Sequence, residues 1–261
     1  MPATYLDRIL EAHRTAARAD VRSLDSLLED VADLDPTRGF RSALTAASEG
    51  VAIISEIKRR SPSKGDLFAD LDPGLLASTY ERGGATCLSV LTDEQWFGGS
   101  VADLRTARTA ASLPVIRKDF TVDARDVVDA RLMGADCVLL IAAALDDAEL
   151  RDFRALANEV GLDALIEIHD EAELERALTA DGDLIGVNQR DLVTFAVDQQ
   201  RAVRLAPQIP SGVVRVAESG VRDASDAAAL ATAGYHALLV GEMLVRSSDP
   251  ASEIRRLRGL D

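Results

Sequence analysis

Short apolar runs alternate with amphipathic segments along most of this chain. From residue 51 onward, eight apolar runs are typical of buried strands, and they begin about 27 residues apart, the length of one strand–helix unit. They start at Val51, Cys87, Val115, Cys137, Ala164, Leu184, Val213 and Ala237. Between them, the amphipathic spacing predicts helices, among them residues 123–133, 147–160, 171–180 and 224–233. Glycines follow several of these segments, where a helix C-cap is expected.

This regular alternation favours a closed barrel. Continuous apolar strands that alternate with helices indicate a parallel sheet covered by helices. Eight units favour a barrel over a doubly wound sheet, and no G-x-G-x-x-G motif follows the first run. We therefore predict an α/β fold, a single-domain (β/α)8 TIM barrel over residues 1–261.

The first 45 residues differ from the rest of the chain. Leu6, Ile9 and Leu10 fall at helical spacing, a similar pattern follows from Leu24 to Val31, and nothing in this segment is typical of a strand. Residues 1–45 are therefore predicted to form an N-terminal helical extension. We expect it either to cap the bottom of the barrel or to lie over its mouth.

Composition and charge narrow the classes of function. The net charge of −15 would repel phosphate backbones, so we expect no nucleic-acid partner. The uncharged apolar run of residues 138–145 is too short to cross a bilayer, and no basic-then-apolar leader is visible at the N-terminus. We expect a cytoplasmic protein without a membrane partner. Cys87 and Cys137 lack metal-ligand spacing and are expected to be buried thiols.

Lysine is nearly absent from the sequence. There are 26 arginines and three lysines, and the acids divide into 29 Asp and 15 Glu. A GC-rich genome explains an arginine excess, whereas adaptation to high salt also explains the excess of Asp, so we favour salt adaptation. The retained lysines, Lys58, Lys64 and Lys118, suggest a task that guanidinium cannot perform, such as proton transfer.

Polar residues gather where the predicted strands end, the edge at which barrels carry their chemistry. By alternation, Glu56 and Lys58 point to the barrel axis, and we expect the other strand-end side chains to converge on the same pocket. They are Lys118, Glu167, Asn188, Arg190 and Glu218. Buried structural ion pairs are the alternative interpretation. We expect His169, on the loop side of Glu167, to be structural, as well as His13 and His236.

The last two strand ends predict a phosphate site. Loops after strands seven and eight of a barrel commonly bind phosphate through backbone N–H groups. Ser219-Gly220 and Gly241 lie at these two positions. The alternative is that both are merely tight turns between strand and helix. Because glycine-containing turns occur at both of the predicted positions, phosphate binding is favoured.

At these strand ends the chain resembles the indole-3-glycerol phosphate synthase family. The motifs are residues 55–65 (SEIKRRSPSKG), 91–94 (LTDE) with 97–100 (FGGS), 117–120 (RKDF), 167–171 (EIHDE), 186–192 (GVNQRDL) and 217–220 (AESG). The resemblance covers essentially the whole chain. It implies ring closure, decarboxylation and dehydration of 1-(2-carboxyphenylamino)-1-deoxyribulose 5-phosphate to indole-3-glycerol phosphate, CO2 and water, in tryptophan biosynthesis, by a carboxy-lyase.

The resemblance also implies roles for the strand-end residues. Lys118 is implied as general acid and Glu167 as general base. Lys58 is implied to hold the substrate carboxylate or phosphate and to serve as a second acid, with the order of the two lysines left open. The remaining residues orient these groups or bind substrate: Glu56, Glu218, Asn188, Arg190, the phosphate-binding Ser61, Ser219, Gly220 and Gly241, and the aromatic Trp96, Phe97 and Phe120. No metal or organic cofactor is implied.

Three residues depart from the family pattern. Gln189 stands where many members have Asn, Glu242 where many have Ser, and Arg60 is bulkier than the usual residue. Two other functions stay open: another phosphate-binding barrel isomerase of amino-acid biosynthesis, and a noncatalytic binding subunit of the pathway. We expect a monomer or a weak homodimer.

Overall fold

The computed structural model describes residues 3–47, 49–61, 65–68 and 70–260. Its centre is a closed barrel of parallel strands in the order β1-β10-β9-β8-β7-β6-β5-β4. The strands are β1 Ala52–Ile57, β4 Cys87–Leu91, β5 Val115–Lys118, β6 Cys137–Ile141, β7 Asp163–Ile168, β8 Leu184–Asn188, β9 Val214–Glu218 and β10 Ala237–Val240. Each begins within one residue of its predicted start, so the predicted barrel is confirmed.

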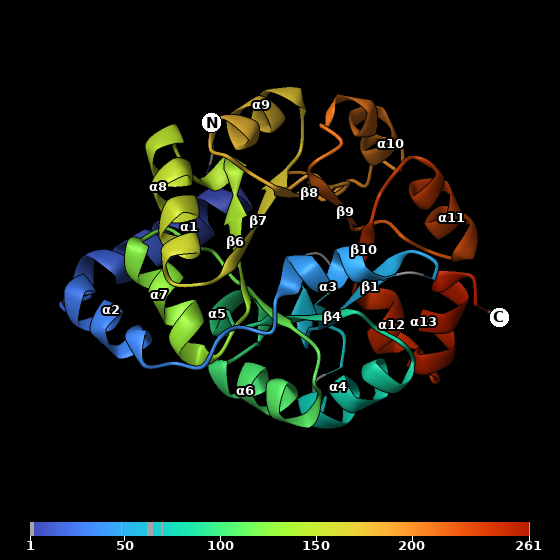
Figure 1. The fold of residues 1–261 in the computed structure, drawn as a ribbon, viewed down its shortest axis with the longest axis horizontal. Coiled ribbons are helices and arrows are strands. Elements are labelled where there is room, and N and C mark those ends of the chain that lie inside the picture. The colour runs from blue at the N-terminus through green and yellow to red at the C-terminus, as the bar shows by residue number, and fades with distance from the viewer. Residues whose placement is uncertain (1–2, 48, 62–64, 69, 261) are drawn as a thin grey trace.

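Helices surround the barrel (Figure 1). They are α4 Pro73–Arg82, α5 Glu94–Phe97, α6 Val101–Ala110, α7 Ala124–Met133, α8 Asp147–Glu159, α9 Glu171–Thr179, α10 Arg201–Leu205, α11 Ala224–Thr232, α12 Glu242–Arg246 and α13 Pro250–Arg258. A small hairpin of β2 Arg60–Ser61 and β3 Gly65–Asp66 follows β1. The helix between β8 and β9 is short, and residues 189–200 before it form an irregular segment at the carboxyl end of β8.

The N-terminal helices occupy both of the places expected for the extension. Helix α1 (Tyr5–Ala19) lies at the mouth, where His13 contacts Asp93 and Asp119 just beyond β4 and β5. Helix α2 (Leu24–Ala32) packs against α7. Helix α3 (Phe40–Ala46) closes the opposite end of the barrel, because Phe40 and Leu44 pack against the amino-terminal parts of the strands (Figure 1).

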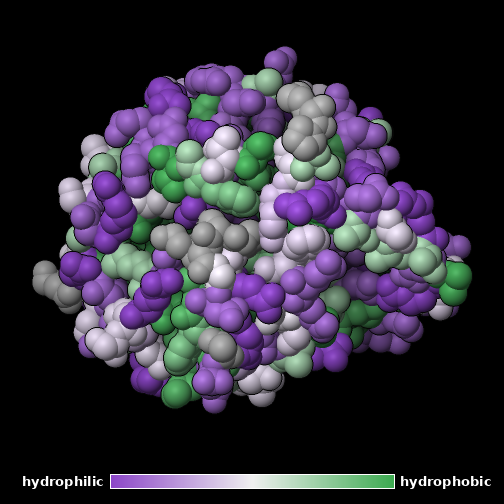
Figure 2. Space-filling model, turned by 180° about the vertical axis from the view of Figure 1, so that it is seen from behind, coloured by the Kyte–Doolittle hydropathy of each residue, from purple (hydrophilic) through white to green (hydrophobic). Residues whose placement is uncertain are grey.

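Apolar side chains form two layers. One fills the barrel interior and includes residues from α1 and α3, and the other lies between the strands and the outer helices. Cys87 and Cys137 are buried in the first layer, and burial raises the pKa of both thiols well above the ordinary value. The opposite face of the molecule from Figure 1 is mostly hydrophilic, with hydrophobic side chains in limited patches (Figure 2). Over the described residues, no helix is long and apolar enough to cross a membrane.

Candidate active site

A cavity of about 600 Å³ opens at the carboxyl ends of the strands. Except for Trp96, the site residues predicted above line it: Glu56, Lys58, Ser61, Phe97, Lys118, Phe120, Glu167, Asn188, Arg190, Glu218, Ser219, Gly220 and Gly241. Lys64 lies outside the described residues. The barrel brings these groups together because its parallel strands all end at the same edge.

The ammonium group of Lys118 lies between two buried carboxylates. Its Nζ donates to Glu167 Oε2 at 2.8 Å and to Glu218 Oε2 at 3.2 Å. Burial opposes the charged form of Lys118, but the charges of Glu167 and Glu218 outweigh it and raise the pKa of this lysine above its ordinary value. Burial likewise opposes ionisation of Glu167, but Lys118 lowers the pKa of Glu167 to about 2. At neutral pH, these two groups form a buried ion pair.

Glu218 is held in a different state. Burial raises the pKa of Glu218 to about 7, although Lys118 opposes the shift. Its Oε1 is buried and accepts no hydrogen bond from any residue that the structure describes. This oxygen lies so close to Gly186 in β8 that a Cβ atom there would collide with it. The glycine therefore makes room for a carboxyl that titrates near neutral pH.

Glu56 and Lys58 form a second acid–base pair at the end of β1. Lys58 Nζ donates to Glu56 Oε1, and Glu56 Oε2 accepts from Ser89 Oγ at 3.4 Å. Glu56 is 4% exposed. A side chain at Gly241 would overlap the Glu56 carboxylate, so this glycine is needed for the carboxylate as well as for the cavity wall.

The segment after β8 is organised by Asn188. Its Nδ2 donates to Glu167 Oε1 at 3.1 Å, and its Oδ1 accepts from the Arg190 backbone N–H at 3.0 Å. The Arg190 side chain donates to the Phe195 carbonyl at 3.2 Å. Asn188 thereby couples the orientation of the Glu167 carboxylate to that of the following loop.

Two consecutive left-handed residues form the turn after β9. Ser219 has φ 64° and Gly220 φ 81°, and their carbonyls accept from Gln189 Nε2 and Gln199 Nε2, both at 2.8 Å. Gln189, a departure from the family pattern, is thus a buried support of this turn. Ser61 Oγ is buried and makes no hydrogen bond within the described part of the chain, so it is available to a ligand.

Two departures from the family pattern, Glu242 in the cavity wall and Arg60 in the β2–β3 hairpin, leave every predicted group of the cavity in place. The Glu242 carboxylate lies 3.6 Å from Arg246 Nε, one helical turn further along α12. Arg60 pairs with Asp66 in the β2–β3 hairpin at 3.2 Å. Each of these two residues therefore has an ion-pair partner close by in the sequence.

One side of the cavity is aromatic and aliphatic. The rings of Phe97 and Phe120 lie 6.3 Å apart, and Leu139, Ile141 and Leu239 extend this wall. Phe195 also lines the cavity, with φ 59°, a strained value for a bulky residue. Phe195 had no signal in the sequence, because it lies in an irregular loop. The expectation for Trp96 is wrong: it packs against Tyr5, with ring centroids 5.2 Å apart, and is not part of the cavity wall.

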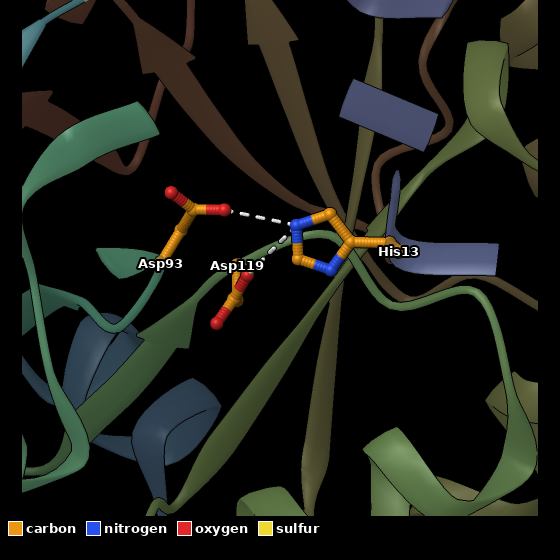
Figure 3. A group of neighbouring side chains, drawn as sticks. All are labelled: His13, Asp93 and Asp119. Atoms are coloured by element: carbon orange, nitrogen blue, oxygen red, sulfur yellow. Dashed lines mark hydrogen bonds and ion pairs between the residues drawn. The ribbon is translucent and has the colours of Figure 1, made fainter. Parts of the chain in front are cut away.

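His13 joins α1 to the mouth (Figure 3). Its Nε2 lies 2.9 Å from Asp93 Oδ2 and 3.9 Å from Asp119 Oδ1. Burial lowers the pKa of His13, but these carboxylates outweigh it and raise the pKa above its ordinary value. The carboxylates have other partners: Asp119 accepts from Arg117 at 3.1 Å and Asp93 from the Trp96 N–H at 2.6 Å. We therefore interpret this cluster as a set of ion pairs that hold α1 at the mouth of the barrel, rather than as a metal centre, and we call His13, Asp93 and Asp119 the latch.

The barrel and its cavity define the class of protein. Buried lysine–carboxylate pairs at the mouth of a (β/α)8 barrel, beside a glycine-containing turn after β9, are typical of barrel enzymes that carry out acid–base chemistry on phosphorylated substrates. A sequence model of the family described as indole-3-glycerol phosphate synthase matches residues 6–257. The chain belongs to this family, whose members are carboxy-lyases of tryptophan biosynthesis.

Relatives named indole-3-glycerol phosphate synthase agree over the full length. One from Nocardioides sp. is 48% identical over 99% of both chains. One from Hyphomonas neptunium is 45% identical over 98% of both chains.

More distant solved structures share the fold. A 3-hexulose-6-phosphate synthase has a TM-score of 0.64 at 14% identity and covers 80% of this chain and 99% of its own. A thiamine phosphate pyrophosphorylase from Pyrococcus furiosus has a TM-score of 0.59 at 14% identity, covering 80% and 94%. At this identity, the similarity concerns the barrel alone.

Proposed function

We propose that the cavity converts 1-(2-carboxyphenylamino)-1-deoxyribulose 5-phosphate to indole-3-glycerol phosphate, CO2 and water. The observation that carries the proposal is Lys118 held between Glu167 and Glu218, in a chain that belongs to the indole-3-glycerol phosphate synthase family. The reaction needs an acid that is protonated at the start and a base that is ionised at the start, and this pair supplies both.

In ring closure, the ring carbon that bears the carboxylate attacks the ketone carbon of the sugar chain. The ketone oxygen gains negative charge, and Lys118 stabilises it and transfers a proton to it. The carboxylate then leaves as CO2, and its bonding electrons restore the aromatic ring. The positive charge that this step needs comes from Lys118 and Lys58, so no cofactor is invoked.

In dehydration, the new hydroxyl leaves as water while a base removes a proton from the adjacent methylene. Glu167 is the proposed base, and Lys58, paired with Glu56, is the proposed acid for the departing hydroxyl. Asn188 holds Glu167, and Glu218 holds Lys118 and faces the substrate hydroxyls. The two lysines have separate carboxylate partners, which supports separate steps.

Substrate binding divides between the two sides of the cavity. The wall of Phe97 and Phe120 would hold the anilino ring. Arg190, which also lines the cavity, would position the sugar chain. Backbone N–H groups of Ser219, Gly220 and Gly241, with the Ser61 hydroxyl, would bind the phosphate.

The first test replaces Lys118 by Met and follows product formation by indole fluorescence at low and high salt. We expect turnover to fall about 10²- to 10⁴-fold, the usual contribution of a general acid. Arg151→Met is the control, because Arg151 is an exposed cation on α8 that pairs with the neighbouring Asp152 at 2.9 Å. Absence of turnover by the parent at every salt concentration would contradict the proposal, and undiminished sugar-phosphate isomerisation by Lys118→Met would favour a barrel isomerase.

A further inference from the structure

The His169 ring approaches one oxygen of the Glu167 carboxylate, and Lys118 binds the other. His169 Nε2 is 3.6 Å from Glu167 Oε1, whereas Lys118 contacts Oε2. On its other side, Nδ1 lies 3.0 Å from Glu173 Oε2, which also accepts the backbone N–H of His169 at 2.7 Å. His169, which was expected to be a structural residue on the loop side of Glu167, thus lies within ion-pair distance of this carboxylate. Glu173, His169, Glu167 and Lys118 form a continuous chain from α9 to β5.

The partners of the ring determine where its protons lie. An ionised carboxylate only accepts hydrogen bonds, so Glu173 holds a proton on Nδ1. A neutral ring would then present the Nε2 lone pair to an oxygen of Glu167, which is repulsive. An imidazolium instead presents an N–H. Nε2 is buried and makes no hydrogen bond with any described residue, and the Glu167 carboxylate lies 3.6 Å from it.

We propose that His169 is a positioning residue for Glu167: as an imidazolium held by Glu173, it fixes the carboxylate of the base and keeps it ionised. This inference rests on the proposed role of Glu167 as general base. The imidazolium and Lys118 contact different oxygens of Glu167, so rotation of the carboxylate would break at least one of these two interactions. Asn188, which shares Oε1, is neutral and cannot supply this charge.

The charges around the ring support the cationic state. Burial lowers the pKa of His169, but Glu173 and Glu167 outweigh it and raise the pKa above its ordinary value. Arg201 from α10 opposes the cation; its guanidinium is held on the Asn188 carbonyl at 2.8 Å. Lys118 and Glu218 lie beyond Glu167 and largely offset each other when both are charged. Two carboxylates against one facing cation favour the imidazolium.

This arrangement predicts that turnover falls as the pH rises. Below the raised pKa of His169, the ring is charged and Glu167 is fixed. As pH rises through that pKa, the ring becomes neutral, its lone pair faces Glu167, and the base loses its fixed orientation. We expect kcat to fall on the alkaline side at the pKa of His169, with little change in KM, because the ring does not line the cavity.

The first measurement is the titration of His169 by NMR, assigned against single substitutions of the other two histidines. Glu167→Gln and Glu173→Gln should each lower the pKa of His169 by about one unit or more, as expected when a carboxylate partner within ion-pair distance is removed. Glu175→Gln, an equal charge change at an exposed position of α9, should leave it nearly unchanged. A pKa at or below 6.5 that does not respond to Glu167→Gln would overturn the proposal.

The second measurement compares two substitutions of His169 by kcat and its pH profile. In His169→Gln, the amide can replace Nε2 and donate to Glu167, whereas in His169→Asn it reaches only toward Glu173. We expect Gln, which keeps a donor toward Glu167 but not the charge, to lose about threefold in turnover at neutral pH and to lose the alkaline limb, and Asn, which keeps neither, to lose about tenfold. Identical profiles for parent and both variants would make the ring merely structural. The titration gives its answer even if the proposed reaction fails, so the two failures are distinguishable.

Discussion

At the residue scale, two glutamates of similar burial carry opposite pKa shifts. Glu167 receives hydrogen bonds from Lys118 and Asn188, so its ionised form is favoured. Glu218 shares Lys118 but leaves Oε1 without a partner among the described residues, so burial dominates. Carboxyls whose surroundings separate their pKa values in this way are typical of acid–base sites.

Glu218 predicts a dependence of stability on pH. Because its pKa is raised to about 7, the folded state holds a proton that the unfolded state releases above about 4.5. Stability contributed by this proton is therefore lost as pH rises from about 4.5 to 7. We expect Glu218→Gln to gain roughly 1–3 kcal/mol in unfolding free energy relative to the parent between pH 5 and 8.

Urea unfolding of the parent and of Glu218→Gln at about pH 5 and about pH 8 measures this difference in unfolding free energy. Glu159→Gln, at an exposed position of α8, is the control and should show no such relative gain. Parallel stability profiles for parent and Glu218→Gln would show that Glu218 titrates alike in both states.

At the element scale, helix α1 is held at the mouth of the barrel by a small number of side chains. Thr4 and Asp7 form a capping box that begins the helix locally, and Ile9 is its one buried residue. Its attachment to the mouth comes from His13 with Asp93 and Asp119, from Arg14 with Glu149 at 2.7 Å, and from aromatic contacts of Tyr5. Such an element is expected to open more readily than the barrel.

The latch predicts that α1 docks more tightly at low pH. The pKa of His13 is raised in the folded state, so the stabilisation is complete below about 6.5 and is lost as pH rises through the raised value. Amide exchange in α1, corrected for intrinsic rates, should accelerate several-fold across this range in the parent. His13→Gln should show fast exchange at both ends, because an amide does not titrate.

Trp96 provides a second readout of this docking. It is the single tryptophan of the chain, and it packs edge-on against Tyr5 of α1. Its emission should follow the same pH transition in the parent and in the control His236→Gln. A transition that persists in His13→Gln would assign it to another group.

At the scale of the whole molecule, negative charge dominates. The net charge is −15, and most cations are arginines, many of them paired locally with carboxylates, such as Arg22 with Asp20 at 2.6 Å. Local pairing of this kind offsets only part of the self-repulsion between carboxylates. Salt would screen the remainder.

The salt hypothesis therefore predicts a melting temperature that rises with potassium chloride. We expect a gain of several degrees between low and molar salt, since roughly 1 kcal/mol shifts the melting temperature of a chain of this size by about 2–4 °C. Calorimetry at a fixed pH measures it. Melting curves that do not change up to multimolar salt would leave codon usage as the explanation of the arginine excess, without bearing on the proposed reaction.

The sequence alone determined the barrel and which residues meet at its mouth. Apolar runs at regular spacing specify strands, and parallel strands in a barrel bring Lys118, Glu167 and Glu218 to one edge whatever the details of packing. The motifs at these edges were sufficient for the resemblance, because they lie within single strand ends. These features depend on local pattern and on one rule of topology.

The tertiary structure alone decided how those residues pair. Lys118 contacts Glu167 and Glu218 through side-chain orientation across strands distant in sequence, whereas Lys58 pairs with Glu56 at the end of its own strand. The position of Phe195 in an irregular loop, the docking of His13 and the approach of His169 to Glu167 likewise depend on contacts between separate elements. Such contacts leave no repeating pattern in the sequence. They form only when the barrel closes, because a charge buried without a partner is energetically costly.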